Sequence, residues 1–297
     1  MSSQRIAVIA HSGKTLGGGL SELRRVFERR GITPILWREV PKSKYAPKQI
    51  EKAIKAKADL IFVWGGDGMV QRSIDVAAGS RATLAILPAG TANLLASNLG
   101  IPKDLEQAVE IGLSGACRRL DVGRINGERF AVMAGAGFDA RMIGDADGSL
   151  KDRFGRLAYI WTGAKHLRDK PFKAKISVDG ARWYDGEASC ILFGNVGKLF
   201  GGVEAFEDAR PDDGILELGV VSADGTRQWA QTIARAVVGN VAKSPQARTT
   251  KVHSVRISLN KKVPYELDGG ERKRVKKLRV DVEHRAVEVC VPVAVPA

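Results

Sequence analysis

Strand-like and helix-like segments alternate through roughly the first 120 residues, and this alternation limits the possible folds more than any other feature of the chain. Short apolar runs fit buried strands at Arg5–Ala10, Thr33–Trp37, Asp59–Trp64 and Ala82–Leu87. The stretches that follow the first three fit helices, at Leu20–Arg30, Pro47–Lys57 and Met69–Ala78. This order predicts a parallel sheet with helices on its faces.

The pattern changes after about Leu120, where most strand-like segments follow one another without helices between them. These segments are Phe130–Ala134, Ala174–Val178, Ala188–Phe193, Leu216–Val221, Val255–Leu259 and Leu278–Val282. Turn signals such as Asn126-Gly127 separate many of them. Two helical stretches, Phe154–Leu167 and Thr226–Val238, interrupt the series. We expect an α/β domain in residues 1–122 and a mainly antiparallel β domain in residues 123–297.

Glycine-rich loops follow three of the four predicted parallel strands, at Ser12–Gly19, Gly65–Gly68 and Gly90–Asn93. The carboxyl ends of parallel strands lie at one edge of the sheet, where such sheets bind ligands. Glycine lets the backbone approach an anion closely, and helix N-termini present N–H groups to phosphate. Thr91 and Asn93 can add side-chain hydrogen bonds. The three loops together predict a phosphate-binding edge.

Asp67 stands within the second of these loops. A carboxylate repels a bare phosphate, so its presence there favours a Mg²⁺ ion between Asp67 and a nucleotide. The loops match neither the P-loop nor the dinucleotide-binding pattern Gly-x-Gly-x-x-Gly. The sequence therefore indicates a nucleotide site of another kind.

The cysteine and hydropathy patterns exclude several other classes of protein. Cys117, Cys190 and Cys290 are far apart and odd in number, so we expect reduced, buried thiols with neither a disulfide framework nor a zinc site. No apolar run reaches the roughly 18 residues of a membrane span, and the first ten residues do not resemble a signal peptide. These features predict a cytoplasmic protein.

The chain carries a formal net charge of +14 and therefore attracts polyanions. Basic residues are dense in Lys261–Arg285. We expect this segment to help the protein approach anionic phospholipid head groups, and an ordinary solvated surface is the alternative. Aromatic residues make up only 6% and no recognition motif is present, so no nucleic acid partner is predicted.

Two segments, Val63–Val70 and Leu87–Asn93, together resemble the catalytic domain of the diacylglycerol kinase and sphingosine kinase superfamily, especially the bacterial soluble diacylglycerol kinases. The similarity continues over most of the chain, in Ala134–Ala140, Lys151–Tyr159, Gly194–Gly202 and Ala209–Leu216. The resemblance implies a phosphofructokinase-like α/β domain, a β-sandwich domain and a nucleotide cleft between them. It also implies that the chain's end returns towards the first domain.

The same resemblance implies site residues. Those expected to bind ATP are Ser12, Gly13, Gly65, Gly66, Asp67, Gly68, Met69, Val70, Gln71, Gly90, Thr91 and Asn93. Asp213 would join an Asp–water–Mg²⁺ network, with the main-chain carbonyls of Arg210 and Ile215 completing a structural metal site.

Three positions depart from the family pattern. Met69 stands where a hydroxyl residue is usual, and Ala10-His11 stands where Asn-Pro is common. The family's general base is the Glu of an Asp-Gly-Glu triplet, whereas this chain has Asp268-Gly269-Gly270-Glu271. Either Glu271 or Asp268 is then the base, and we favour Glu271.

The implied activity is transfer of the γ-phosphoryl group of ATP to a hydroxyl of a diacylglycerol-like or sphingoid lipid, by a cytoplasmic protein that visits membranes. An NAD kinase-like soluble kinase is one alternative, because it shares the Gly-Gly-Asp-Gly turn. A catalytically degenerate lipid-binding module is another, supported by Met69 and the displaced Glu271. The choice of lipid and the presence of a homodimer stay open.

Overall fold

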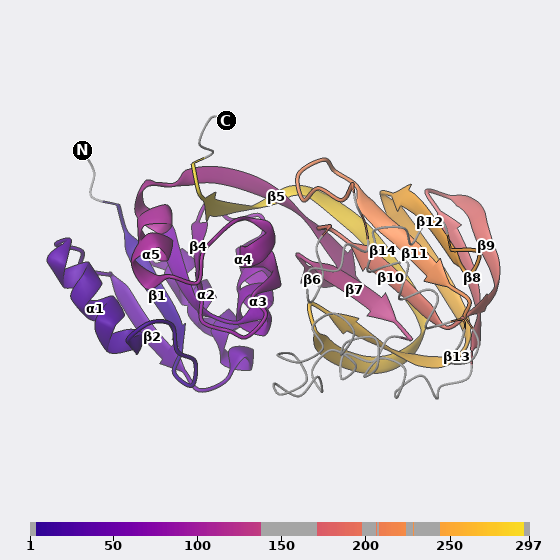
Figure 1. Ribbon diagram of the computed structural model, residues 1–297, viewed down its shortest axis with the longest axis horizontal. Coiled ribbons are helices and arrows are strands. Elements are labelled where there is room, and N and C mark those ends of the chain that lie inside the picture. The colour runs from indigo at the N-terminus through magenta and orange to yellow at the C-terminus, as the bar shows by residue number, and fades with distance from the viewer. Residues whose placement is uncertain are drawn as a thin grey trace. The chain divides into compact units, whose positions relative to one another are not determined.

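The chain forms two compact units in the computed structural model, which describes residues 4–137, 171–197, 206, 208–223, 228 and 244–293 (Figure 1). The first unit contains Met1–Val122 together with Arg285–Ala297, and the second contains Gly123–His284. The helices predicted at Phe154–Leu167 and Thr226–Val238 lie outside the described residues, except for Gln228.

A parallel sheet forms the centre of the first unit. Its strands are β1 (Ile6–His11), β2 (Leu36–Val40), β3 (Leu60–Gly65), β4 (Thr83–Pro88) and the end of β14 (Gly270–Val291). Their order is β14-β4-β3-β1-β2. The four predicted strands are confirmed, but β2 begins at Leu36 rather than Thr33. Pro34 has no N–H to donate to a ladder, and regular pairing starts beyond it.

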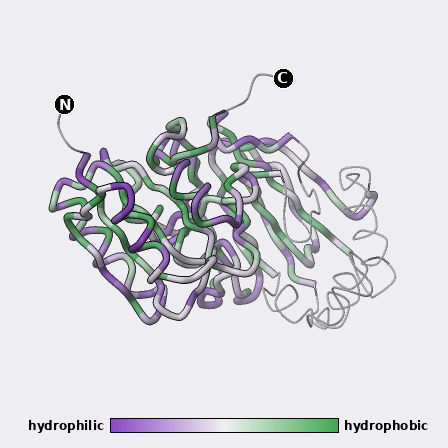
Figure 2. Tube along the Cα trace, turned by 60° about the vertical axis from the view of Figure 1, so that its left-hand side comes forward, coloured by the Kyte–Doolittle hydropathy of each residue, from purple (hydrophilic) through white to green (hydrophobic). Residues whose placement is uncertain are grey.

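Five helices of the first unit are α1 (Gly19–Arg29), α2 (Ala46–Lys55), α3 (Asp67–Ala77), α4 (Leu94–Asn98) and α5 (Leu105–Ser114). Phe27 of α1 and Gly112 of α5 both pack on the ring of Phe62 in β3. Every residue of β3 and β4 is buried, so both faces of the sheet are covered. Helices α1 and α5 cover the face that carries Phe62, and the packed pair α2 and α3 covers the opposite face. Hydrophobic and hydrophilic stretches alternate accordingly along this part of the chain (Figure 2).

The second unit is antiparallel. Its strands are β6 (Glu128–Phe130), β7 (Met133–Ala136), β8 (Phe172–Val178), β9 (Ala181–Ala188), β10 (Cys190–Gly194), β11 (Leu216–Val221), β12 (Ala247–Val252) and β13 (Ser254–Leu267). Their main order is β12-β11-β10-β7-β13, and β8 joins β13 to β9. A cluster of buried residues that includes Phe130, Ile191 and Leu218 forms the core.

The prediction of one continuous strand at Phe130–Ala134 is wrong. The structure divides it into β6 and β7, because the carboxylate of Asp268 accepts the N–H groups of Ala131, Val132 and Met133. Those N–H groups are satisfied by a side chain instead of a neighbouring strand.

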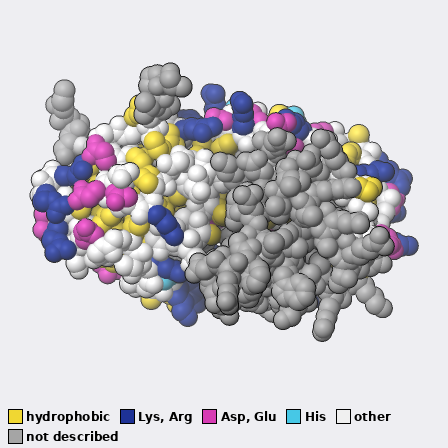
Figure 3. All heavy atoms as spheres, in the orientation of Figure 1, with side chains coloured by type: hydrophobic (Ala, Val, Ile, Leu, Met, Phe, Trp, Pro, Cys, Tyr) yellow, Lys and Arg dark blue, Asp and Glu magenta, His cyan; other side chains and the backbone are white. Residues whose placement is uncertain are grey.

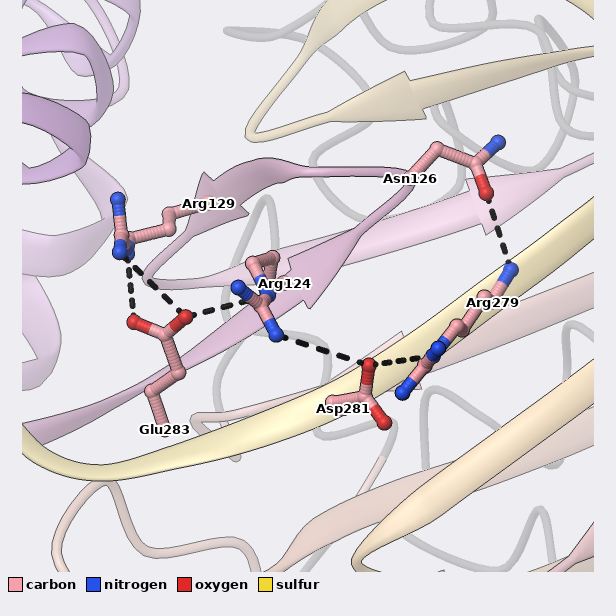
Figure 4. A network of polar contacts seen from close by, with 6 residues as sticks. All are labelled: Arg124, Asn126, Arg129, Arg279, Asp281 and Glu283. Carbon is pink, nitrogen blue, oxygen red and sulfur yellow. Dashed lines mark hydrogen bonds and ion pairs between the residues drawn. The ribbon is translucent and has the colours of Figure 1, made fainter.

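A polar network joins β14 to β6 and to β5 (Ala116–Ile125), on the part of both long strands that belongs to the second unit (Figure 4). Glu283 accepts from Nε of Arg129 at 2.6 Å and forms an ion pair with Nε of Arg124 at 3.1 Å. Asp281 contacts Nε of Arg279 at 3.0 Å. Part of the basic charge predicted for this region is therefore neutralised by acidic neighbours.

Candidate active site

Strands β4, β3 and β1 are neighbours in the first unit, so the loops that leave their carboxyl ends emerge side by side. Gly65 pairs with Pro88, and Trp64 lies between Ala10 and Leu87 in the ladder. The indole Nε1 of Trp64 donates to the carbonyl of Lys14 at 3.0 Å, which ties the first loop to β3. The sheet thus brings together the three loops that the sequence predicts to bind phosphate.

The second and third loops touch backbone to backbone at Gly66 and Gly90. A Cβ built on Gly90 would lie 2.4 Å from the Cα of Gly66, and one built on Gly66 would lie 3.0 Å from the Cα of Gly90. The contact at Gly90 leaves no room for a side chain, because real Cβ atoms do not come so close to a backbone atom, and the contact at Gly66 is tight enough that the neighbouring loop would have to shift. Gly90 therefore requires glycine for this close approach, and Gly66 strongly favours it.

Asp67 holds these two loops together. Its Oδ2 accepts the N–H of Asn93 at 2.9 Å, and its Oδ1 accepts the N–H of Leu94 at 2.5 Å. The carboxylate thereby satisfies N–H groups at the start of α4. Burial raises the pKa of Asp67 above its usual value, while the two N–H bonds and the charge of Lys103 oppose that rise.

Asn93 shapes the third loop from within. Its backbone is left-handed, with φ of 50°. Its Oδ1 accepts the N–H of Gly90 at 2.8 Å, and its Nδ2 donates to the carbonyls of Gly90 at 2.8 Å and Pro88 at 3.2 Å. The side chain is buried, and its polar atoms are engaged by the loop itself.

The first loop is fastened at its start. Ser12 donates its N–H to the carbonyl of Val40 at 3.0 Å, and Gly13 donates its N–H to Nδ1 of His11 at 3.1 Å. Both Ser12 and Gly13 are exposed. His11, which departs from the family's usual proline, therefore takes part in closing this loop.

The side chains of Met69, Val70 and Gln71 point into the interior, since they are only 0%, 6% and 3% exposed. Met69 lies under Gly65, whose Cβ, if present, would be 2.5 Å from the Met69 Cβ. Gly68 by contrast has open space around the position of a Cβ. In this region only the backbone and the Gly68 face are available to a ligand, so the missing hydroxyl at Met69 removes no surface contact.

Lys103 is a cation of this edge that the sequence reasoning missed. Its Nζ donates to the carbonyl of Thr91 at 3.0 Å, and its charge lowers the pKa of Asp67. Both Lys103 and Thr91 are exposed. A single lysine beyond α4 gives no signal in a one-sequence pattern, because only the return of the chain places it beside Thr91.

The two candidate bases differ sharply in the second unit. Asp268 is 5% exposed and accepts three backbone N–H bonds, each 2.9 Å long, from Ala131, Val132 and Met133. Glu271 is exposed and stands opposite Glu266 in the β13–β14 ladder. Asp268 and Gly269 form a two-residue turn, so the extra Gly270 pairs with Leu267 and belongs to β14.

Asp213 lies in a turn before β11. Its Oδ1 accepts the N–H of Ile215 at 3.0 Å. The pKa of nearby Glu217 is raised mainly by burial; Lys251 lowers it, and the negative charges of Asp208 and Asp213 raise it further. Among the described residues, no group of three or more His, Cys, Asp or Glu side chains could hold a metal. The predicted site at Arg210, Asp213 and Ile215 relies partly on carbonyls.

Two family models match consecutive parts of the chain. Residues 5–125 match the diacylglycerol kinase catalytic domain, and residues 132–291 match the YegS C-terminal NAD kinase beta sandwich-like domain. A diacylglycerol kinase of Bacillus subtilis strain 168 is 30% identical over 227 residues, covering 74% of this chain and 73% of that protein. A Pseudomonas aeruginosa PAO1 protein named probable lipid kinase YegS-like is 26% identical, covering 100% of this chain and 97% of its own length.

Solved structures support the same fold. A crystal structure of a diacylglycerol kinase from Bacillus anthracis str. Sterne superposes with a TM-score of 0.75 at 20% identity, over 98% of both chains. An NAD kinase from Archaeoglobus fulgidus in complex with ATP has a TM-score of 0.53 at 11% identity, over 96% of this chain and 93% of that one. The expected fold class, an α/β domain followed by an antiparallel β domain, is confirmed, and the chain belongs to the family of diacylglycerol kinases and YegS-like lipid kinases.

Proposed function

We propose that this chain transfers the γ-phosphoryl group of ATP to the hydroxyl of a diacylglycerol-like or sphingoid lipid. The observation that carries the proposal is the close approach of Gly66 and Gly90, which leaves bare backbone where the loops of two neighbouring strands meet at the carboxyl edge. Bare backbone at such an edge suits a phosphate chain. The family match supports a lipid kinase.

The residues present fit a Mg²⁺ ion that arrives with the nucleotide. A carboxylate offers about four acceptor positions, and the N–H groups of Asn93 and Leu94 use two of those of Asp67. Mg²⁺ commonly takes one or two protein carboxylates and fills its shell with phosphate and water. Bound there, the ion offsets phosphate charge, while Asp67 keeps the two loops in place.

Lys103 contributes positive charge to the same edge. Its amine now donates to the Thr91 carbonyl, and an exposed lysine can move to a phosphate oxygen without breaking the fold. Phosphoryl transfer depends chiefly on positioning and charge stabilisation, so a cation at this place favours ATP binding.

Glu271 is the base that we assign, because it is exposed, whereas Asp268 is buried and accepts three amides. Glu271 would accept the proton of the lipid hydroxyl as that oxygen attacks the γ-phosphorus. The metal proposed at Arg210, Asp213 and Ile215 would be structural. The negative charge that Asp208, Asp213 and Glu217 share supports a cation in this region.

A basic surface on the second unit supports access to anionic membranes. Lys175 and Lys277 flank Ser258 on neighbouring strands, and Arg256 stands directly opposite Arg279. Asp281 already neutralises Arg279, so the net positive charge of this face rests on Arg256 and the two lysines, and like charges on neighbouring strands favour an anionic partner. We call Lys175, Arg256 and Lys277, all exposed, the outer basic surface. Elsewhere, on the face shown in Figure 3, many Lys and Arg side chains lie beside Asp or Glu.

Among the described residues, no helix is long and apolar enough to cross a lipid bilayer. Because the proposed substrate is a lipid, peripheral association with the membrane surface is part of the proposal.

The deciding experiment is a radiolabelled ATP assay against a panel of diacylglycerol, sphingosine, ceramide, a polyprenol and NAD, with the products identified by mass spectrometry. We expect a phosphorylated lipid, a loss of at least about 100-fold in rate for Asp67→Ala, and a similar loss for Glu271→Gln. Labelled NADP, or no product together with retained ATP binding, would overturn the proposal in favour of an NAD kinase or a binding module.

Vesicle sedimentation tests the outer basic surface. A triple variant with alanine at Lys175, Arg256 and Lys277 loses three charges, each worth about 1 kcal/mol near an anionic surface, so partitioning should fall roughly 100-fold at low salt. A control triple variant at exposed Lys48, Lys52 and Lys55 on α2 removes the same charge. Equal losses in the two variants would refute a specific docking surface.

A further inference from the structure

The end of β14 runs antiparallel beside β5 within the first unit (Figure 1). Three contacts show how the two strands lie beside each other. A Cβ on Gly115 would lie 2.5 Å from the carbonyl oxygen of Val291, Nε of Arg119 lies 3.3 Å from Oε2 of Glu288, and the N–H of Arg285 donates to Asp121 at 2.6 Å. From Gly115 to Asp121 the residue numbers increase, while those of their contacts decrease from Val291 to Arg285, so the two strands are antiparallel.

Two residues further along each strand from the Arg119–Glu288 ion pair, Cys117 of β5 is level with Cys290 of β14. Their thiols are close enough to share a hydrogen bond, and the Sγ of Cys290 also lies 3.5 Å from the carbonyl of Gly112. Directly opposed residues of an antiparallel pair have Cα atoms roughly 4.5 to 5.5 Å apart, which is within the span of a disulfide.

The two thiols differ in access to solvent. Cys290 is 4% exposed, whereas Cys117 is exposed. The expectation that all three cysteines are buried is therefore wrong for Cys117, which lies near the start of β5, where the residues face solvent. An exposed thiol beside a buried one is the arrangement in which an oxidant reaches the first and the second resolves the product.

We propose that Cys117 and Cys290 are a modification site, an oxidisable dithiol that a peroxide converts to a disulfide across β5 and β14. The proposal uses contacts within the first unit alone and does not depend on the lipid kinase activity.

The chemistry balances in two steps. The Cys117 thiolate attacks one oxygen of hydrogen peroxide, an S–O bond forms as the O–O bond breaks, and the hydroxide released takes up a proton to leave as water. The Cys290 sulfur then attacks the Cys117 sulfur of the sulfenic acid, the S–S bond forms, and the S–O bond breaks. The departing hydroxide combines with the Cys290 proton, so two thiols and one peroxide give one disulfide and two waters.

The second step has a defined pH dependence. Burial, followed by the nearby Cys117 and Glu288, raises the pKa of the Cys290 thiol to about 12. Only a small fraction of Cys290 is thiolate near neutral pH. As long as the pH stays below the pKa, that fraction increases about tenfold with each unit by which the pH rises. Disulfide formation from the Cys117 sulfenic acid should therefore accelerate about tenfold from pH 7 to pH 8.

A disulfide here closes a long loop of chain, because its cysteines lie near the beginning of β5 and the end of β14. Long loops lose the most unfolded-state entropy when they are closed. Oxidation should therefore raise the Tm of the protein by roughly 5 °C, and a reductant should reverse the rise.

The test treats the intact protein with a small excess of hydrogen peroxide, blocks remaining thiols, and maps peptides by mass spectrometry without reduction. The wild type and Cys190→Ser should each yield a Cys117–Cys290 linked peptide and the Tm rise. Cys117→Ser should yield neither, and Cys290→Ser should accumulate a dimedone-reactive sulfenic acid at Cys117.

Cys190 is the matched control, since it is equally buried, has a pKa also raised to about 12, and packs against Ala223 in the second unit. A wild-type protein in which Cys117 is oxidised to sulfinic acid with no linked peptide overturns the proposal. A linked peptide that joins Cys190 to either cysteine would overturn it as well.

Discussion

Three carboxylates near the candidate site differ in their hydrogen-bond partners and in their exposure to solvent. Asp67 accepts two N–H groups at the start of α4, and Asp268 accepts three N–H groups between β6 and β7. Glu271 is exposed at the beginning of β14. Asp268 and Glu271 are close together in the sequence, but Asp268 holds the backbone between two strands while Glu271 faces solvent.

Replacing Asp268 by alanine should destabilise the second unit by about 3 kcal/mol or more, because three buried amides lose their acceptor. Glu271→Ala should change stability by less than about 0.5 kcal/mol while it removes phosphoryl transfer. Urea unfolding and the lipid kinase assay measure the two effects. If Asp268→Ala left stability intact and abolished activity, the two roles would have to be exchanged.

Gly90→Ala should weaken ATP binding at least 10-fold, because its Cβ would meet the backbone of Gly66 at 2.4 Å and force the loops apart. Gly68→Ala is the stability control: its Cβ enters open space within α3, so the unfolding free energy should hold or rise by up to about 1 kcal/mol. Isothermal titration with ATP and thermal unfolding provide the measurements. Unchanged ATP affinity in Gly90→Ala would show that the loop contact is not needed.

At the scale of elements, loops gain their positions from the helices and strands that flank them. Helix α5 is capped by Asp104, whose Oδ1 accepts the N–H of Gln107 at 2.8 Å, and its Gly112 lies on Phe62 and Ala85. The short helix α4 starts at the N–H groups that Asp67 holds. Both helices therefore depend on contacts with strands and loops far away in sequence.

Gly112→Ala should destabilise the first unit by about 1–3 kcal/mol, since its Cβ would come within 2.4 Å of the Phe62 ring and 2.8 Å of the Ala85 Cβ. Ser114→Ala at the exposed end of the same helix should cost less than about 0.5 kcal/mol. Chemical unfolding followed by far-UV circular dichroism compares the two. Equal stability in both variants would mean that α5 can move away from the sheet at little cost.

For the molecule as a whole, the first unit is completed by the end of the chain. Val289 pairs with Leu84 in parallel register, and Glu288 Oε1 accepts the hydroxyl of Thr83 at 2.7 Å. Val287 and Val289 are 3% and 0% exposed. A unit that begins at the N-terminus therefore cannot bury β4 without residues from the other end.

Truncation after His284 should lower the stability of the first unit by at least about 3 kcal/mol, because two buried valines and their ladder are lost. Truncation after Pro292 removes Val293, which is 63% exposed, and should change the Tm by less than about 2 °C. Differential scanning calorimetry of the purified variants is the measurement. A His284-truncated protein with the wild-type Tm would show that the returning strand is dispensable.

Local patterns were sufficient for the parallel strands, for the three glycine-rich loops and for the fold class. The reason is that buried strands and glycine turns have strong short-range signatures, as in Leu60–Gly65 followed by Gly66. The sequence alone likewise carried the family resemblance, because Gly65–Gly68 and Gly90–Asn93 occur together.

Tertiary structure decided what local patterns could not express. The carboxylate of Asp67 meets Leu94, Lys103 meets Thr91, Asp268 meets Ala131, and Cys117 meets Cys290. Each pair depends on a return of the chain, whose direction is set by the burial of whole elements rather than by neighbouring residues. One sequence names the residues of such pairs, but only the fold brings them within reach of each other.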